Sequence, residues 1–409
     1  MNVLYERCAG LDVHKQTVVA CRRVVAGAQV VREVRSFPTT TRGLLVLADW
    51  LREAGCMQVA MESTGVYWKP VWHVLEGEFE LVLANAAHIR NVPGRKSDVN
   101  DATWIADLLA HGLIRASFVP PRPIQELRDL TRTRKQLVRE VVQHQQRIQK
   151  VLEDANVKLD SVVSNVLGAS GRRMLRAMIA GEQNPDKLAA LADGRLAASR
   201  DTLAEALHGR ITRHHRFLLK QHLDMVEHLE KTVGEFEAQI EAALKPFHAV
   251  IERLLTIPGV SATVASVIVA EIGVDMQRFR TVGHLVSWAG LCPGLNQSAG
   301  KVKSRTLRNG APWLKTVLVQ SAWAACRNKD GYLRAQFLRI KSRRGPKKAI
   351  MAVAASILTA AYHLVRDPVL YRDLGPVYLL RLDHERAAAR LTQRLRNLGY
   401  EVQLRKVAA

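Results

Sequence analysis

Four carboxylates in the first part of the chain could act together on a phosphodiester. Asp12 stands in an apolar stretch, Glu62 ends another, and Asp98 and Asp101 follow in "RKSDVNDA". An acidic side chain inside an apolar strand is costly unless it is paired or bound to a cation, so Asp12 is the most informative. Four converging carboxylates can hold two divalent ions about 4 Å apart, which activate the attacking oxygen and stabilise the leaving oxygen. Oxygen ligands predict Mg²⁺ or Mn²⁺ as the cofactor.

Each of these acids also has a structural interpretation. Asp98 could favour a helix N-terminus electrostatically, and Glu62 could end a strand in solvent. Ser97 is typical of an N-cap, which would place Asp98 and Asp101, three residues apart, on one face of a helix. Asp107 is six residues beyond Asp101, so we expect it to rotate away and face solvent.

The elements that must position these acids are predicted to form a mixed sheet over residues 1–120. Apolar runs at "RCAGLDV", "TVVACRRVV" and "VVREVRSF" lie at hairpin distances and predict three antiparallel strands. "TTTRGLLVLADWLREAG" has a threonine N-cap, helical apolar spacing and a glycine stop. "QVAMES" and "ELVLANA" are predicted strands on either side of a short helix in "GVYWKPVWHVLEG". This order is typical of an RNase H-like α/β fold.

A second candidate group lies in the stretch "PGLNQSAG" at 293–300. Ser298 stands among Gly, Pro and Asn, so a surface turn explains the stretch without any chemistry. A nucleophile would use the same flexibility, and cations nearby would neutralise the phosphate under attack. The cations that we predict to bind nucleic acid are Lys301, Lys303, Arg305, Arg308, Lys315, Arg343, Arg344, Lys347 and Lys348.

Two further features of this region suggest nucleic-acid contacts. "LLTIPGVSATV" is similar to half of a helix-hairpin-helix, whose Pro-Gly turn opens a helix with free backbone N–H groups for a phosphate. Ser261 replaces the usual second glycine, and a merely structural turn is the alternative. Trp288, Trp313 and Trp323 could stack on bases, although their helical spacing favours the core for two of the three.

Long helices are predicted after the proline-rich junction "FVPPRP" at 118–123. Two apolar stripes recur at helical spacing. They are Leu127, Leu130, Leu137, Val141, Ile148 and Leu152, and then Leu219, Leu223, Val226, Leu229, Val233, Phe236, Ile240 and Leu244. They predict either a long antiparallel coiled-coil pair or seam between protomers, or an ordinary bundle within one subunit. The histidines His208, His214, His215, His222 and His228 lack an acid or cysteine to complete a metal site and are expected on a polar face.

The composition favours a polyanionic partner. The formal net charge is +22 over 409 residues, and such an excess repels itself unless nucleic acid is nearby. The N-terminus has no signal-peptide pattern, which predicts a cytoplasmic, nucleoid-associated protein without a membrane partner. The longest apolar run, "AIMAVAASILTAAYHLV", is interpreted as a buried helix. Five scattered cysteines predict reduced, packed thiols.

The predicted organisation has four parts: an α/β domain at 1–120, a helical domain at 124–250, a second helical domain at 251–366 and an extension at 367–409. The extension carries an amphipathic helix over about 383–398. It either contacts RNA or a partner, or caps the helical domain, and the sequence favours neither.

Six motifs, in this order and at comparable separations, resemble the IS one-ten (IS110) family of insertion-sequence transposases, relatives of the pilin-gene invertases. They are "GLDVHK", "MESTG", "RKSDVNDA", "TIPGV", "WAGLCPG" and "NQSAGK". Many relatives have a serine directly before the glycine, whereas Ala299 separates Ser298 from Gly300 here. Ser304 is therefore an alternative nucleophile.

The resemblance implies a RuvC-like N-terminal domain whose D-E-D-D metal site is Asp12, Glu62, Asp98 and Asp101. It implies a helical C-terminal transposase domain whose catalytic nucleophile is Ser298. Such proteins work as homo-oligomers, dimers or tetramers, on donor and target DNA, with a structured guide RNA encoded by the element. In the implied mechanism, Ser298 attacks a phosphodiester to give a phosphoserine link and a 3′-hydroxyl leaves.

Two other functions fit the same residues. A metal-dependent nuclease of the junction-resolving type would hydrolyse DNA with the carboxylates, and Ser298 would only shape a turn. A non-catalytic nucleic-acid-binding scaffold would use the positive charge alone. Variants of Ser298 and Asp12 distinguish these functions from a transposase.

Overall fold

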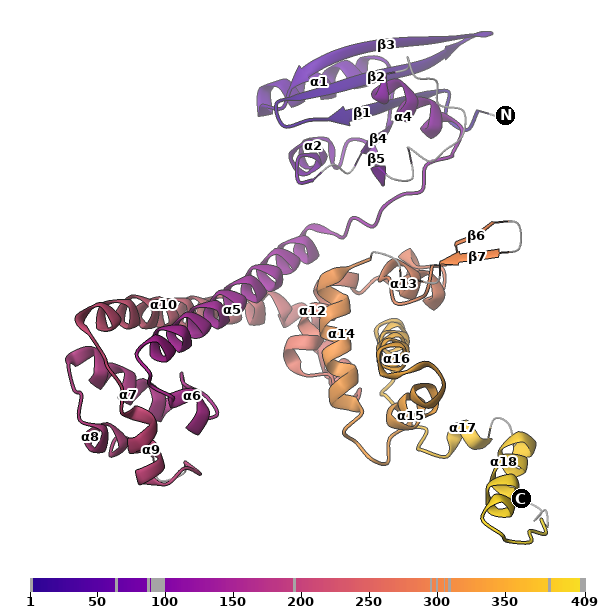
Figure 1. Cartoon of the computed structure of the whole chain (residues 1–409). Helices are drawn as coiled ribbons and strands as arrows, with labels where there is room; N and C mark the ends of the chain where they lie inside the picture. Colours follow the sequence, from indigo (N-terminus) through magenta and orange to yellow (C-terminus); the bar gives the residue numbers. More distant parts are fainter. Residues whose placement is uncertain are drawn as a thin grey trace. The chain divides into compact units, whose positions relative to one another are not determined.

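The computed structural model describes residues 3–62, 65–86, 89, 100–193, 196–294, 296–298, 301–304, 306–307, 310–381 and 384–404. The chain divides into two compact units, Met1–Val119 and Pro120–Ala409. The first unit is an α/β structure and the second is almost entirely helical (Figure 1). These findings confirm the coarse fold class, while the RNase H-like relationship and the finer division at 124–250, 251–366 and 367–409 stay predictions.

The first unit is built on a five-stranded mixed sheet in the order β3-β2-β1-β4-β5. Its elements are β1 (Arg7–Val13), β2 (Thr17–Ala26), β3 (Gln29–Pro38), α1 (Thr41–Glu53), β4 (Gln58–Glu62), α2 (Trp68–Leu75), β5 (Glu80–Ala84) and α4 (Asp101–Ala110). The first three strands are antiparallel neighbours, whereas β4 and β5 continue parallel to β1. The three-strand meander and the strand-helix alternation are therefore as expected.

Both faces of this sheet are covered by helices. One core lies between β1, β2 and β4 and the helices α1 and α2, and includes Leu11, Met61, Leu47 and Leu75. A smaller core on the other face joins Cys8, Ala60 and Ala84 to α4. The N-cap of α1 is Thr40, whose hydroxyl accepts a hydrogen bond from the Gly43 N–H, as its sequence position suggests.

A long pair of antiparallel helices opens the second unit. They are α5 (Arg122–Asp154) and α10 (Arg213–Leu244). Arg134 pairs with Glu237 near one end, and Asp154 pairs with His215 at the other, so the two helices run in opposite directions. The predicted antiparallel pairing of the two stripes is confirmed, and the coiled-coil geometry and a seam between protomers stay predictions.

Short helices pack around a further core at the end of this pair that contains Asp154 and His215. They are α6 (Leu159–Val162), α7 (Ala169–Ala180), α8 (Pro185–Ala189) and α9 (Arg200–Leu207). The core contains residues from α5, α7 and α10, including Leu152, Met174 and Leu223. This packing explains the burial of the two apolar stripes at residues 148–152 and 219–229, whereas Leu127 and Ile240 are buried toward the other end of the pair.

The expectation that the histidines lie on a polar face is wrong for two of them. His215 is 9% exposed, and its Nε2 lies 2.8 Å from Asp154 Oδ2. His222 Nδ1 lies 3.2 Å from His144 Nδ1 across the helix pair, and burial lowers the pKa of both rings. The reason is that antiparallel packing brings side chains far apart in sequence against each other.

The rest of the second unit is a helical domain with one small hairpin. Its elements are η1 (Lys245–Phe247), α11 (His248–Leu255), α12 (Ala262–Ile272), η2 (Met276–Arg278), α13 (Val282–Trp288), β6 (Asn296–Ser298), β7 (Lys301–Ser304), α14 (Pro312–Ala325), α15 (Tyr332–Arg344), α16 (Pro346–Arg366), α17 (Tyr378–Arg381) and α18 (His384–Asn397). The Pro-Gly turn joins α11 to α12, and Gly259 has a φ of 82°. A Cβ there would collide with the Ser321 carbonyl oxygen of α14, so this position requires glycine.

Helix α16 is the long apolar run that the sequence marks. By length and composition it is the one described helix that could cross a membrane, but 56% of its most apolar window is buried inside the fold. Its buried side chains include Val353, Ile357 and Leu358. The interpretation as a buried helix is therefore confirmed for this segment.

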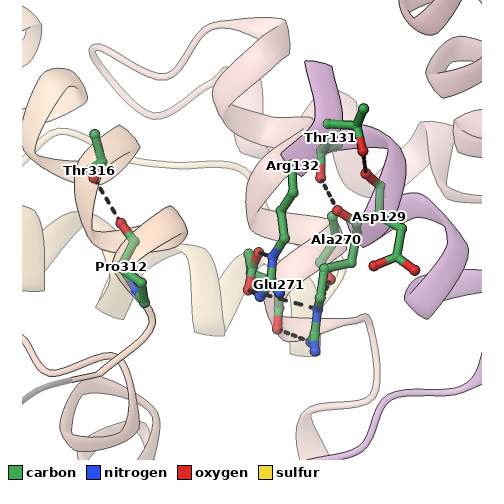
Figure 2. A network of polar contacts seen from close by, with 9 residues as sticks. Asp129, Thr131, Arg132, Ala270, Glu271, Pro312 and Thr316 are labelled. Atoms are coloured by element: carbon green, nitrogen blue, oxygen red, sulfur yellow. Dashed lines mark hydrogen bonds and ion pairs between the residues drawn. The ribbon is translucent and has the colours of Figure 1, made fainter. Parts of the chain in front are cut away.

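A buried ionic network joins α5 to α12 (Figure 2). Glu271 is 1% exposed, and its two carboxylate oxygens accept hydrogen bonds from Arg132 at 2.8 and 2.9 Å. Arg128 donates to the carbonyl oxygens of Ala270 and Glu271 at the C-terminal end of α12, where a cation is stabilised by the helix dipole. The guanidinium of Arg132 also lies 5.8 Å from the ring of Trp313 on α14. The entry helix α5 is thus fixed to the helical domain.

Candidate active site

Strand β1 carries Asp12 on the face of the sheet that α4 covers. The residues of β1 that lie in the core beneath α1 and α2 are Ala9, Leu11 and Val13. Side chains alternate along a strand, so Gly10 and Asp12 face the other way. A Cβ at Gly10 would collide with the Ala102 carbonyl oxygen and the Ala106 nitrogen, so α4 rests directly on the β1 backbone. Asp12 therefore lies close to the first turn of α4.

Strand β4 brings Glu62 to the same end of the same face. The two strands are parallel, with Leu11 opposite Met61, so Asp12 and Glu62 come next at neighbouring carboxyl ends. Ala60, two residues before Glu62, packs in the core beneath α4. Glu62 consequently faces that side too, and it is only 7% exposed.

Helix α4 supplies the third carboxylate, because it begins at Asp101. Its N-cap is Asn100, whose side-chain oxygen accepts a hydrogen bond from the Ala102 N–H at 2.9 Å. The N-cap prediction for Ser97 is therefore wrong, since asparagine caps the first turn just as well and stands directly before it. Asp98 lies outside the described residues, so the expectation that it shares one face with Asp101 stays a prediction.

The environment of Asp12 disfavours its charged form. Burial raises the pKa of Asp12 above its ordinary value, and the nearby charge of Asp101 raises it further. His14 opposes both effects, because its Nε2 lies 3.2 Å from Asp12 Oδ2. The effect of Asp101 on Asp12 indicates that the two carboxylates lie within electrostatic reach of each other.

The donor set has the chemistry of a hard divalent cation site. Carboxylate oxygens are the ligands that Mg²⁺ and Mn²⁺ prefer, and a cation would relieve the unfavourable charge of Asp12 next to Asp101. Among the residues that the structure describes, no group of three or more His, Cys, Asp and Glu side chains is arranged to hold a metal ion. The fourth predicted ligand, Asp98, lies outside that set.

Asp107 does not face solvent as expected. Its Oδ1 accepts hydrogen bonds from Arg23 at 3.0 Å and from Arg32 at 2.9 Å, and only 23% of its side chain is exposed. Helix α4 crosses strand β2, so an acid one and a half turns after Asp101 meets arginines of β2 and β3 instead of water. Asp107 therefore anchors α4 to the sheet and contributes to the site only by position.

Ser298 lies in a hairpin rather than in an irregular turn. It is the last residue of β6, and it stands opposite Lys301 at the start of β7. Away from Ser298, the pairing of the hairpin continues through a β-bridge between Pro293 and Leu307. The Gly294 N–H donates to the Thr306 carbonyl oxygen at 2.8 Å. Residues 299 and 300 lie outside the described part of the chain. The backbone of Ser298 is thus placed at the tip of a two-stranded ribbon.

The predicted nucleic-acid-binding cations divide into three groups. Lys301 and Lys303 are exposed on β7, and Lys315 is half-buried on α14. Arg305 and Arg308 lie outside the described residues. The four cations where α15 ends and α16 begins are all exposed: Arg343, Arg344, Lys347 and Lys348.

Comparison with known protein families decides the identity of the chain. One transposase model, that of the IS110 elements with the DEDD designation, matches residues 9–157. A second model, the transposase of the IS116/IS110/IS902 family, matches residues 251–338. The chain belongs to the IS110 family of transposases. The two matches together span more than half of the chain, and no curated protein matches it.

The two matches contain the two candidate groups of this transposase separately. The first includes the four predicted metal ligands, and the second includes Ser298 and the cations up to Lys315. The cations of α15 and α16 follow the second match. DNA is therefore the partner that family membership supports.

One residue that lies beside the candidate metal-binding carboxylates was not identified from the sequence. His14 stands two positions after Asp12 in "GLDVHK" and contacts its carboxylate, with 59% of the His14 side chain exposed. The sequence contained a signal for this contact: His14 directly follows strand β1, which carries Asp12 near its end, so its side chain can turn back toward that acid. This contact favours the charged form of Asp12.

Proposed function

We propose that this transposase cuts and rejoins DNA strands through a covalent phosphoserine intermediate at Ser298, with Asp12, Glu62, Asp98 and Asp101 as a divalent-metal site. The observation that carries the metal part is the placement of Asp12 and Glu62 at neighbouring strand ends beside Asp101. The strand order of the mixed sheet supports the part of the proposal that makes the first unit RNase H-like and RuvC-type. The serine part rests on the family membership.

The proposed step conserves the phosphodiester bond energy. The Ser298 Oγ bonds to phosphorus as the bond from phosphorus to the 3′ oxygen breaks; Oγ gives up its proton to a base and the 3′ oxygen takes one. Rejoining reverses these events with a 3′-hydroxyl from a second strand. The four carboxylates would hold Mg²⁺ or Mn²⁺, which supplies Lewis-acid stabilisation of phosphoryl oxygens. Lys301 and Lys303 on β7 stand where they would bind the backbone of the same strand.

Trapping of a covalent protein–DNA adduct tests the serine. Denaturing gels of wild-type protein with substrate DNA are expected to show the adduct, and Ser298→Ala should abolish it. Ser304→Ala is the matched control, because Ser304 lies on the partner strand of the same hairpin and should keep the adduct. Undiminished strand cutting by Ser298→Ala would instead identify a hydrolytic, junction-resolving type of nuclease.

The metal ligands are tested with a matched pair on the first unit. Asp12→Asn is expected to lower strand cutting by several orders of magnitude while DNA binding persists. Asp49→Asn, which removes an exposed acid of α1 from its ion pair with Arg52, should keep most of the activity. DNA cutting by Asp12→Asn at the wild-type rate would contradict the metal site.

A guide RNA and a homo-oligomer complete the proposal. Their support is the family resemblance and the net charge of +22, which exceeds what a few catalytic contacts require. Sequencing of RNA that copurifies with the protein should recover a structured transcript from the flank of its own element. Light scattering of the RNA-bound protein should give a dimer or a tetramer. A monomer free of RNA that still exchanges strands at the same rate would contradict both parts.

A further inference from the structure

One tryptophan of the helical domain is exposed where the others are packed. All seven tryptophans lie among the described residues, and Trp323 alone is exposed, at 47% of its surface. Trp288 packs against Phe279, with ring centroids 5.7 Å apart, and Trp313 lies beneath Arg132 and Arg139. Trp323 is therefore the tryptophan whose ring surface is most open to a ligand.

The Trp323 ring is held in place by a neighbour on the next helix. Phe337 of α15 lies against it, with ring centroids 5.6 Å apart and an angle of 63° between the planes. Phe337 itself is only 7% exposed, so it belongs to the core and gives the indole a fixed support. This edge contact leaves part of the indole surface open and limits its rotation. A rigid, preorganised aromatic surface is what base stacking needs.

Cations follow the same face of α15. The Lys341 Nζ lies 5.9 Å from the centre of the Phe337 ring. Lys341 and Arg344 are four and seven residues after Phe337, which places all three on one side of the helix. Both cations are exposed.

These cations have no acidic partners, in contrast to those of the helix pair. In the part of the chain that the structure describes, no carboxylate pairs with Lys341, Arg343, Arg344, Lys347 or Lys348. On α5 and α7, by contrast, Arg134 pairs with Glu237 and Arg176 with Glu227. A cluster of unpaired positive charge beside an aromatic surface is complementary to a polyanion with flat, apolar bases.

We propose that Trp323, Phe337, Lys341 and Arg344 form a platform that binds single-stranded DNA, with an unpaired base stacked on Trp323 and the adjoining phosphates on Lys341 and Arg344. The strand must be unpaired, because the flat faces of bases within a duplex are already covered by their neighbours. The choice of DNA rests on the transposase function, which requires strands to separate and exchange. The platform follows the serine hairpin in the chain, since α14 begins at Pro312.

Binding of labelled single-stranded DNA to the full-length protein tests the platform. Trp323→Ala is expected to weaken this binding about 5- to 150-fold, the range found for loss of one base-stacking side chain, and to change duplex binding less than twofold. Trp323→Phe should retain most of the affinity because a ring remains, whereas Trp323→Leu should lose as much as the alanine variant. Thermal unfolding of each variant checks that the fold is kept.

Phe217→Ala is the matched control, because Phe217 is an exposed aromatic residue, at 59%, on α10 away from this platform. It should bind single-stranded DNA like the wild type. Photo-crosslinking of a bromodeoxyuridine oligonucleotide should attach the base to the peptide that contains Trp323. Single-stranded binding by Trp323→Ala within twofold of the wild type overturns the proposal, and so does equal loss of duplex binding.

Two further measurements distinguish this proposal from RNA binding at the same platform and from the proposed strand exchange through Ser298. An RNA oligonucleotide of the same sequence should bind no more tightly than the DNA, and tighter RNA binding that depends on Trp323 would overturn the assignment to DNA. Ser298→Ala should bind single-stranded DNA as the wild type does. If strand exchange through Ser298 proves wrong, a specific loss in Trp323→Ala would still establish the platform.

Discussion

At the scale of single residues, the most informative side chain is Asp12. It is held in an apolar strand within electrostatic reach of Asp101, and among the described residues the charge that favours its ionised form is that of His14. Such an arrangement costs folding free energy at neutral pH unless a cation is present. A site that is electrostatically unfavourable by itself and favourable with a bound cation is what a metal-dependent enzyme requires.

The pH dependence of stability follows from the direction of the Asp12 shift. A carboxyl whose pKa is raised in the folded state holds its proton more tightly there than in the unfolded chain. Its contribution to stability is therefore present below its unfolded pKa and is lost as the pH rises through its folded pKa. We expect metal-free Asp12→Asn to be more stable than the wild type at neutral pH, and the difference to shrink toward acidic pH.

Thermal unfolding with a chelator, at neutral and at acidic pH, measures this difference. Addition of Mg²⁺ or Mn²⁺ should then stabilise the wild type and leave Asp12→Asn unchanged. Glu33→Gln is a control on the same sheet, because Glu33 pairs with Arg22 on the opposite side of the strands and should show no metal effect. Equal stabilisation of all three proteins by the metal would contradict the assignment of Asp12 as a ligand.

At the scale of elements, the contact between β1 and α4 positions the site. Glycine at position 10 lets the helix backbone approach the strand, which brings the start of α4 next to the end of β1. The ion pairs of Asp107 with Arg23 and Arg32 hold the same helix further along. The distance between Asp12 and Asp101 therefore depends on packing that is remote from both.

Gly10→Ala is expected to destabilise the first unit by about 1–3 kcal/mol or more, because the new methyl group meets two backbone atoms that cannot rotate away. Gly234→Ala is the matched control: a Cβ there meets nothing within 4 Å, and alanine in the interior of α10 should stabilise by roughly 0.5–1 kcal/mol. Urea unfolding of both variants measures the two effects. A neutral Gly10→Ala would show that α4 does not rest on β1.

The Glu271 network is the element contact that fixes α5 to α12. Glu271→Gln removes the buried carboxylate that pairs with Arg132 and with Arg128, whose side chain is only 15% exposed, so we expect a loss of about 3–5 kcal/mol. Glu237→Gln removes the partner of Arg134 from an exposed position of the same helix pair, and such pairs contribute about 0.2–1 kcal/mol. Chemical unfolding followed through the second unit compares them. Equal effects would mean that burial does not strengthen the Glu271 pairs.

At the scale of the whole molecule, the dominant property is the positive charge of +22. Much of the charge on the long helix pair is internally compensated, as Arg134 with Glu237 and Arg172 with Glu230 show. The charge at the end of α15 and the start of α16 is exposed and has no carboxylate partner among the described residues. We therefore expect DNA affinity to depend on α15 and α16 more than on the helix pair.

Replacement of Arg343, Arg344, Lys347 and Lys348 by alanine tests this expectation. If each contacts one phosphate, the slope of log affinity against log salt for duplex DNA should fall by roughly 3 to 4. Alanine at Arg172 and Arg176, which pair with Glu230 and Glu227, is the control. It should change the slope by less than about 0.9, the value for one phosphate contact. Fluorescence anisotropy over a salt series gives both slopes. An unchanged slope in the fourfold variant would remove these cations from the DNA surface.

The sequence by itself determined the strands of the first unit, most helices and the family of this protein, because these depend on local periodicity, capping and ordered motifs. Strand β1, the Thr40 cap and the apolar stripes of α5 and α10 all follow from neighbours within a few residues. Asp12, Glu62 and Asp101 could be selected for the same reason, as acids beside apolar elements. The cap of α4 was misjudged by three residues, since Ser97 and Asn100 are equivalent locally.

Only the tertiary structure decided which side chains meet. That Asp107 binds Arg23 and Arg32, that His14 contacts Asp12, and that Glu271 joins α5 to α12 depend on pairs far apart in sequence or on how a chain turns after a strand. The exposure of Trp323, against the partial or full burial of the other tryptophans, also depends on which helix faces are covered. Helical spacing marks a residue as able to enter a core, and the neighbouring helices decide whether it does.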